Sequence, residues 1–312
     1  MKLDDELALA SRDEDSWLSI GVFDGVHRGH GHLLKQLIAE AAGAGHLSGV
    51  VTFRNHPASV LRPDFQPRYL SSVEERVRLI GDFGVDFVAP VTFDEEVSKL
   101  SARDFVVRLQ RTLRMRGLVV GPDFGLGHKR QGDVKNLTAL GAVLGFDVKV
   151  VENLEYSGAP VKSTAVREAL AKGEIVRAAK LLGRNYALAG VVVGGDKLGR
   201  SLGFPTANLE ATPGMAVPSD GIYAAWALLG GKRFMAATSI GTRPTFGDND
   251  RVIEAFLLDF QGDLYGQDLR LEFVQRLRDQ VKFDAVEELT VQVGADVAQT
   301  RKILEGSKAP AG

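Results

Sequence analysis

The spacing of apolar runs along the chain changes near residue 186, and this change constrains the fold more than any other feature of the sequence. Before that point, short apolar runs alternate with amphipathic stretches long enough to form helices. Strands separated by such helices pair in parallel, because a tight hairpin cannot join them. After it, apolar runs follow one another closely between Gly, Pro and Asp, which is typical of antiparallel strands. This change in spacing therefore predicts two domains, residues 1–185 and 186–312.

The first domain is predicted to be a doubly wound parallel α/β sheet, with a ligand crevice at the carboxyl ends of its strands. Apolar runs predict strands over residues 17–23, 49–53, 85–91, 117–121 and 146–151. A first helix is expected to have Leu33, Leu34 and Leu37 on its apolar face and to be ended by Gly43 and Gly45. Further helices are expected over residues 73–83, where Ser72 and Glu75 have capping-box spacing, and over 103–115, 134–144, 163–171 and 174–182.

The second domain is predicted to be an antiparallel barrel or sandwich. Its strands are expected over residues 187–194, 221–229, 233–240, 252–260 and 269–274. Residues 285–305 then have apolar side chains at helical spacing, among them Val286, Leu289 and Val293. This C-terminal helix is expected to pack against the strands.

Composition excludes several classes of function. The 312 residues include no cysteine, which excludes disulfides, thiolate metal sites and cysteine nucleophiles. Lys and Arg number 38 and Asp and Glu number 40, and this balance disfavours a general nucleic-acid or membrane-surface binder. The acidic N-terminus lacks the apolar core of a signal peptide, and no apolar run reaches the roughly 18 residues of a membrane span. We expect a cytoplasmic protein, monomeric or weakly self-associating, with no nucleic-acid or membrane partner.

Residues 21–30, Gly-Val-Phe-Asp-Gly-Val-His-Arg-Gly-His, connect the first predicted strand to the first predicted helix. A helix N-terminus attracts an anion because its backbone N–H groups point outward. His27 and His30 are three residues apart, so both can face one phosphate and stabilise charge that develops on it. Two other interpretations are a metal site that includes His32, and ordinary surface histidines.

A glycine-rich segment, residues 194–208, follows the first strand of the second domain. Its glycines permit an irregular loop over a ligand, and Lys197 and Arg200 supply positive charge. Thr206 and Asn208 place two hard oxygens on one side of an extended chain, which suits magnesium. The alternative is a surface loop with a Pro-Thr turn.

The first segment resembles the H-x-G-H signature of nucleotidyltransferases, in the form typical of the FMN adenylyltransferase module of bifunctional FAD synthetases. The segments Thr52–Pro57, Gly121–Gly127 and Val161–Arg167 resemble three further motifs of that module. The resemblance implies that His27 and His30 hold ATP phosphates in the transition state. It also implies ATP or phosphate contacts from Phe23, Asp24, Gly25, Ser163, Thr164 and Arg167, and flavin contacts from Asp123 and Phe124.

This chain departs from the family pattern in the first domain. Gly125 and Leu126 stand where Arg and Phe are usual. Lys162 replaces a Ser and adds a cation next to the expected phosphate site. Without the family context, Ser163 and Thr164 are equally typical of a helix N-cap.

The second segment resembles the riboflavin kinase motif G-x-x-L-G-R-x-L-G-F-P-T-A-N. Matching segments follow at Gly221–Ala224, Ile240–Phe246, Ile253–Phe260, Leu264–Gly266 and Leu271–Phe273, with Phe256 where many relatives carry His. The resemblance implies a barrel in which Thr206 and Asn208 bind Mg²⁺ and Glu272 removes the proton of the ribityl 5′-hydroxyl. It implies ATP or phosphate contacts from Gly195, Lys197, Gly199 and Arg200 and a flavin contact from Pro205. By strand alternation alone, Glu272 is typical of a solvent-facing residue between Leu271 and Phe273.

Together the two resemblances cover residues 17–304 and imply a bifunctional riboflavin kinase and FMN adenylyltransferase. Its substrates and products would be ATP, riboflavin, FMN and FAD, with Mg²⁺ as cofactor. Two alternatives stay open: a kinase with an inactive first domain, motivated by Gly125, Leu126 and Lys162, and a flavin-binding regulator without enzymatic activity.

Overall fold

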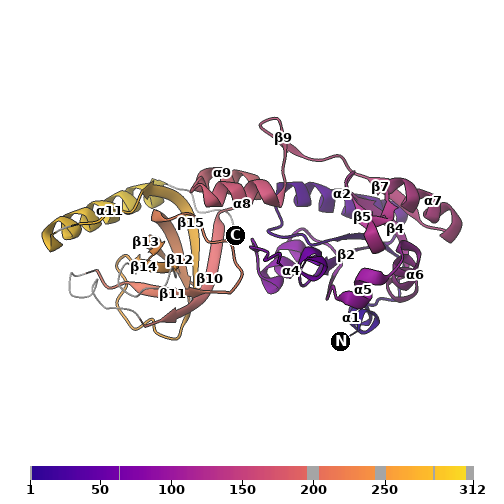
Figure 1. Ribbon diagram of the computed structural model, residues 1–312, viewed down its shortest axis with the longest axis horizontal. Coiled ribbons are helices and arrows are strands. Elements are labelled where there is room, and N and C mark those ends of the chain that lie inside the picture. Colours follow the sequence, from indigo (N-terminus) through magenta and orange to yellow (C-terminus); the bar gives the residue numbers. More distant parts are fainter. Residues whose placement is uncertain (1, 63, 195–203, 243–250, 284, 307–312) are drawn as a thin grey trace. The chain divides into compact units, whose positions relative to one another are not determined.

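The computed structural model describes residues 2–62, 64–194, 204–242, 251–283 and 285–306 (Figure 1). The chain separates into two compact units, residues 1–163 and 164–312. Helices α8 (Ser163–Ala171) and α9 (Ile175–Leu182) form as predicted. However, α9 packs on barrel strands β10 and β15, whereas the sequence analysis assigned both helices to the first domain. A division of the two activities at residue 185 stays a prediction.

The first unit is built on a five-stranded parallel sheet in the order β3-β2-β1-β4-β7. The five predicted strands all form, as β1 (Ser16–Gly21), β2 (Leu47–Phe53), β3 (Phe87–Val91), β4 (Met115–Val120) and β7 (Asp147–Val150). The direction of winding reverses between β1 and β4. At such a switch point, the connections leave neighbouring strands in opposite directions and open a crevice at the strand ends.

The longer helices of this unit match the predicted ones, while several short elements are additional. The longer helices are α2 (Arg28–Ala44), α4 (Val73–Gly81), α6 (Ala102–Leu113) and α7 (Val134–Leu144). The additional elements are α1 (Leu3–Ala8), α3 (Pro57–Leu61), α5 (Glu95–Lys99), a 3₁₀ turn at His128–Arg130, and the pairs β5–β6 (Gly125–Leu126, Gly132–Asp133) and β8–β9 (Glu155–Tyr156, Ala159–Pro160). As predicted, Gly45 ends α2 in a left-handed conformation and the Ser72 side chain caps α4, whereas Gly43 lies within α2.

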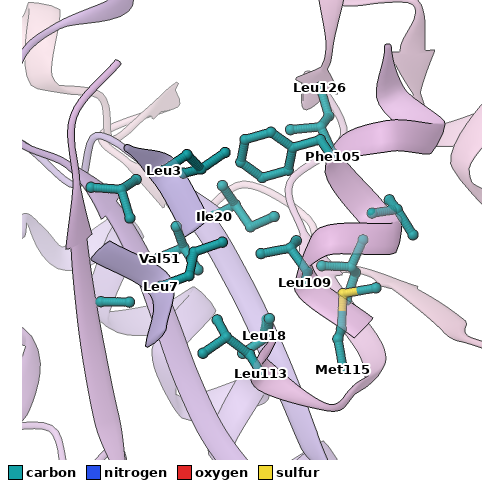
Figure 2. Packing of buried hydrophobic residues seen from close by; sticks show 14 of the residues in the cluster. Leu3, Leu7, Leu18, Ile20, Val51, Phe105, Leu109, Leu113, Met115 and Leu126 are labelled. Carbon is teal, nitrogen blue, oxygen red and sulfur yellow. The ribbon is translucent and has the colours of Figure 1, made fainter. Parts of the chain in front are cut away.

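Both faces of the parallel sheet are covered, which confirms the doubly wound class. Leu18 and Ile20 of β1 belong to a cluster with buried residues of α1 and α6 (Figure 2). Trp17, the neighbour of Leu18, belongs to a second cluster with Leu34 and Leu37 of α2. Each fully buried side chain of this size stabilises the fold by about 1.5–3 kcal/mol.

The second unit is a closed antiparallel barrel of six strands in the order β10-β11-β14-β13-β12-β15. Their bounds are β10 (Tyr186–Val193), β11 (Ala207–Ala211), β12 (Gly221–Leu229), β13 (Lys232–Thr242), β14 (Arg251–Leu257) and β15 (Asp268–Arg278). The barrel confirms one of the two predicted architectures and excludes the sandwich. Five strands correspond to predicted ones, and β11 is the additional strand. Helix α11 (Val286–Gly306) packs on β12, β13 and β15, as expected of the C-terminal helix.

Candidate functional site

A cavity of about 350 Å³ lies at the switch point of the parallel sheet. Its walls come from the residues after β1, β4 and β7 and from the segment that leads into α8. Six of the predicted site residues line it: Phe23, His27, His30, Asp123, Phe124 and Ser163. The fold therefore brings together three of the predicted motifs that are far apart in the sequence.

His27 and His30 are fixed relative to each other at the N-terminus of α2. His27 is the N-cap residue, and its Nδ1 accepts a hydrogen bond from the backbone N–H of His30 at 3.2 Å. The two rings stack, with centroids 3.7 Å apart and planes 13° from parallel. Because Nδ1 of His27 accepts this bond, the proton of its neutral ring sits on Nε2, which is therefore a donor. The pair combines a hydrogen-bond donor with the positive end of a helix, as an anion site requires.

The turn before α2 has an unusual backbone. Phe23, Gly25 and Val26 have φ values of 52°, 76° and 36°. A Cβ on Gly25 would lie 2.7 Å from the Cβ of Leu70, so only glycine can occupy this position without displacing its neighbour. Strand β1 ends at Gly21 instead of at Phe23 as predicted, because this left-handed turn breaks the extended backbone.

Asp24 holds this turn in place and does not line the cavity, and neither does Gly25. The Asp24 side chain is only 3% exposed, and its Oδ1 accepts hydrogen bonds from the backbone N–H groups of Leu70 and Ser71. Arg76, 1% exposed, pairs with the same oxygen at 3.9 Å and donates to the carbonyl of Phe53. Burial lowers the pKa of Arg76, and the charge of Asp24 opposes that shift. Within the described structure, Asp24 therefore positions the turn, and a contact between Asp24 and nucleotide stays a prediction.

Ser163 ties the segment before α8 to the same turn. Its hydroxyl donates to the backbone carbonyl of Asp24 at 3.0 Å. A Cβ on Gly29 would lie 2.7 Å from the carbonyl oxygen of Val161, so glycine is required for this close approach. Thr164 and Arg167 belong to the second compact unit, and their contacts with phosphate stay predictions.

The loop after β4 explains the two departures at Gly125 and Leu126. Leu126 is 6% exposed and packs into the core with Phe105, away from the cavity. Next to Gly125 lies the Arg130 side chain, whose Nε is 3.0 Å from the place of a Cβ. Arg130 donates from Nη2 to the backbone carbonyl of Asp123. The absence of a side chain at position 125 thus leaves room for the side chain of Arg130.

Asp123 and Lys162 form an ion pair between two walls of the cavity. Lys162 Nζ lies 2.9 Å from Asp123 Oδ2. The hydrogen bond and the charge of Lys162 lower the pKa of Asp123. Phe124 also lines the cavity, so both predicted flavin-binding residues of this loop lie in its wall.

A second pocket, of about 560 Å³, lies in the barrel unit. It is bounded by β11, the end of β14 and residues 260–265, and three predicted residues line it: Pro205, Thr206 and Asn208. Phe256 makes an edge-on contact with Phe204, with ring centroids 5.4 Å apart. The predicted phosphate-binding residues Gly195, Lys197, Gly199 and Arg200 lie outside the described residues.

Glu272 is not brought together with Thr206 and Asn208. It lies on β15, two strands away from β11 in the barrel. Its carboxylate lies 3.5 Å from Arg233 Nη2 and 3.5 Å from Arg270 Nε. This geometry does not support Glu272 as the proton acceptor, because neighbouring strands are about 4.8 Å apart and β10 intervenes.

A different carboxylate stands beside the predicted metal ligands. Glu254 of β14 is directly opposite Asn208 of β11 in the antiparallel ladder. Side chains of such a pair share one face of the sheet, with Cβ atoms about 5 Å apart. Glu254 lies within a segment that matches the riboflavin kinase pattern, but no role was predicted for it from the sequence. The strand order of the barrel distinguishes Glu254 from Glu272.

The donor types at Thr206, Asn208 and Glu254 suit magnesium: a hydroxyl, an amide oxygen and a carboxylate. In the part of the chain that the structure describes, no group of three or more His, Asp or Glu side chains is placed to hold a metal. The described histidines are therefore not placed as in the alternative metal site that includes His32. Instead, His27 accepts a hydrogen bond from the backbone N–H of His30.

Comparison with known proteins agrees with the two-unit architecture. The FAD synthetase family model matches residues 9–165, and the riboflavin kinase family model matches residues 182–304. The chain is 37% identical to the bifunctional riboflavin kinase/FMN adenylyltransferase of Escherichia coli K12, over 92% of each chain. It is 39% identical to the protein of the same name from Pseudomonas fluorescens, over 93% of each chain, and 33% identical to that of Bacillus subtilis, over 90% of each.

One solved structure has the same fold under a different name. A protein from Streptococcus pneumoniae described as a macrolide-efflux protein superposes with a TM-score of 0.88 at 28% identity, over 96% of this chain and 97% of the other. That name does not agree with the names of the relatives above, and we take only the fold from this likeness. No helix within the described ranges is long and apolar enough to cross a bilayer. Since both family models and relatives of 33–39% identity match along most of its length, the chain belongs to the family of bifunctional riboflavin kinase/FMN adenylyltransferases.

Proposed function

We propose that the protein converts riboflavin to FMN in its second unit and FMN to FAD in its first. In the first reaction the riboflavin 5′-hydroxyl attacks the γ-phosphorus of ATP and releases ADP. In the second, the FMN phosphate attacks the α-phosphorus of ATP and releases pyrophosphate. The observation that carries the proposal is the cavity at the sheet's switch point, where His27 and His30 stand at the N-terminus of α2.

Adenylyl transfer needs stabilisation of negative charge more than it needs proton removal, because the FMN phosphate is already ionised at neutral pH. The N–H donor of His27 and the backbone N–H groups of α2 supply that stabilisation from fixed positions. The stacked rings leave little freedom to either histidine, so the donors are oriented before the nucleotide arrives. Phe124 and Asp123, which follow β4 and also line the cavity, are the residues that we assign to FMN.

Phosphoryl transfer to riboflavin requires a proton acceptor, since the attacking alcohol must lose its proton. We assign this role to Glu254, because it faces the same side of the barrel as Asn208. Thr206 and Asn208 are the residues that we assign to Mg²⁺, which would screen the charge of the ATP phosphates. Pro205, which lines the pocket, is assigned to the flavin.

One assay tests the proposal and its two alternatives. The full-length protein is incubated with ATP, Mg²⁺ and either riboflavin or FMN, and the flavins are separated by chromatography. We expect riboflavin to give FMN and FAD, and FMN to give FAD with an equal amount of pyrophosphate. A kinase with an inactive first unit would stop at FMN. A regulator without activity would return both flavins unchanged.

A further inference from the structure

The ion pair between Asp123 and Lys162 lies in the wall of the first cavity. Both side chains line that cavity, and both are exposed, Lys162 by 53% and Asp123 by 73%. Asp123 follows β4 and Lys162 precedes α8, so the pair joins two separate walls. An exposed pair of this kind contributes little to stability, because water solvates each charge well on its own. It can therefore open at low cost.

The charges around the cavity make Lys162 exceptional. Among the described residues that line it, Lys162 is the sole Lys or Arg, while Asp123 and Glu152 are carboxylates. A nucleoside triphosphate carries several negative charges, and in this wall it meets one ammonium group that a carboxylate already neutralises. A polyphosphate attracts the ammonium more strongly than a single carboxylate does, because its charge is larger and more concentrated.

We propose that Lys162 binds the polyphosphate of the nucleotide during adenylyl transfer, and that Asp123 masks it until the nucleoside triphosphate enters. When a nucleoside triphosphate enters, the ammonium leaves Asp123 and contacts phosphate oxygens. Pyrophosphate, the leaving group of the forward reaction, is also a polyphosphate anion and is held by the same contact. The inference rests on the proposed adenylyltransferase function of the first unit.

Substitutions of Lys162 and of Asp123 are expected to have opposite effects on nucleotide binding. Removing Lys162 deletes a phosphate contact and weakens nucleotide binding. Removing the charge of Asp123 frees Lys162 before the nucleotide arrives and strengthens binding. If the ion pair only linked the two walls of the cavity, either substitution would break the same ion pair. Both substitutions would then change nucleotide binding in the same direction.

The test measures the KM for ATP in FAD formation by the full-length protein, at saturating FMN and without riboflavin. We expect Lys162→Met to raise it about tenfold, as for one lost charge-assisted contact, and Asp123→Asn to lower it about two- to threefold. Arg130→Met is the matched control: it removes an equal charge beside Asp123 from a residue outside the cavity wall, and it should leave this KM unchanged. Lys162→Arg should retain most of the affinity.

Riboflavin phosphorylation by the second unit serves as an internal check on folding and should stay at the wild-type rate in every variant. Shifts of the same sign for Lys162→Met and Asp123→Asn, or no shift in either, would overturn the inference while the wild-type protein still makes FAD. Failure of the wild-type protein to make FAD from FMN would instead refute the proposed function, and the inference with it.

Discussion

The two sites differ in how the chain assembles them. In the first unit, the histidines that we assign to phosphate are three residues apart at the N-terminus of α2, and local backbone geometry fixes their relation. In the barrel, Asn208 and Glu254 are distant in sequence, and only the pairing of β11 with β14 makes them neighbours. A site of the first kind can be identified from a motif. A site of the second kind requires the strand order.

The largest expected effect tests the strand pairing in the barrel. We expect Glu254→Gln to lower kcat for riboflavin phosphorylation by about 10²–10⁴-fold, because the proton acceptor is lost while the shape is kept. Glu272→Gln is the matched control on β15 and should change this rate only a few-fold. The initial rate of FMN formation measures both. The reverse outcome would restore Glu272 as the proton acceptor and would show that register is a poor guide to this site.

The next effect tests whether the two sites are separate. His30→Ala should lower the rate of FAD formation from FMN by about 10²–10³-fold, since an oriented group at the charged centre is lost. Riboflavin phosphorylation by the same variant should be unchanged. If a folded variant lost both activities, the two sites would share a residue or a conformational step, and the comparison above would not hold.

The sequence predicted elements whose stability is largely local and missed those that depend on distant partners. Amphipathic periodicity was sufficient for α2 and α6. Helix α1 has six residues, too few for stability on its own, and is held by burial of Leu7 and by bonds from Thr92 to Glu6. The motifs supplied residues that line both pockets, whereas a nucleotide contact from Asp24 and a proton-acceptor role for Glu272 stay predictions. Asp24 depends on a buried partner, Arg76, which looks like an ordinary surface residue of a charged helix.

A smaller expected effect concerns stability, and it contrasts a buried ion pair in the first unit with an exposed ion pair in the second. Arg76→Met should lower the free energy of unfolding of the first unit by about 3 kcal/mol, because it leaves the Asp24 carboxylate buried without its cation. Urea denaturation followed by fluorescence measures the loss. Arg301→Met, which breaks the exposed pair with Asp259 in the second unit, should leave the unfolding midpoint unchanged. Equal losses in the two variants would mean that burial does not set the strength of these pairs.

The smallest effect concerns the acid titration of Asp123. Lys162 lowers the pKa of this carboxyl group, mainly through its hydrogen bond. The pair therefore stabilises the native state above the ordinary carboxyl pKa, and that contribution is lost as the pH falls through the lowered value. Lys162→Met should move the Asp123 pKa upward toward its ordinary value, as followed by NMR of the carboxyl carbon. An unchanged pKa would place the cause of the shift elsewhere, for example in Arg130.

The Asp24 carboxylate links the turn at residues 23–26 to Leu70, Ser71 and Arg76, and Arg76 in turn holds the end of β2 at Phe53. Four stretches of chain must therefore have come together before the histidines face their cavity. An incompletely folded molecule would therefore lack this site altogether instead of having a weaker one. Synthesis of FAD should accordingly report the finished state of the first unit and vanish in step with its tertiary structure.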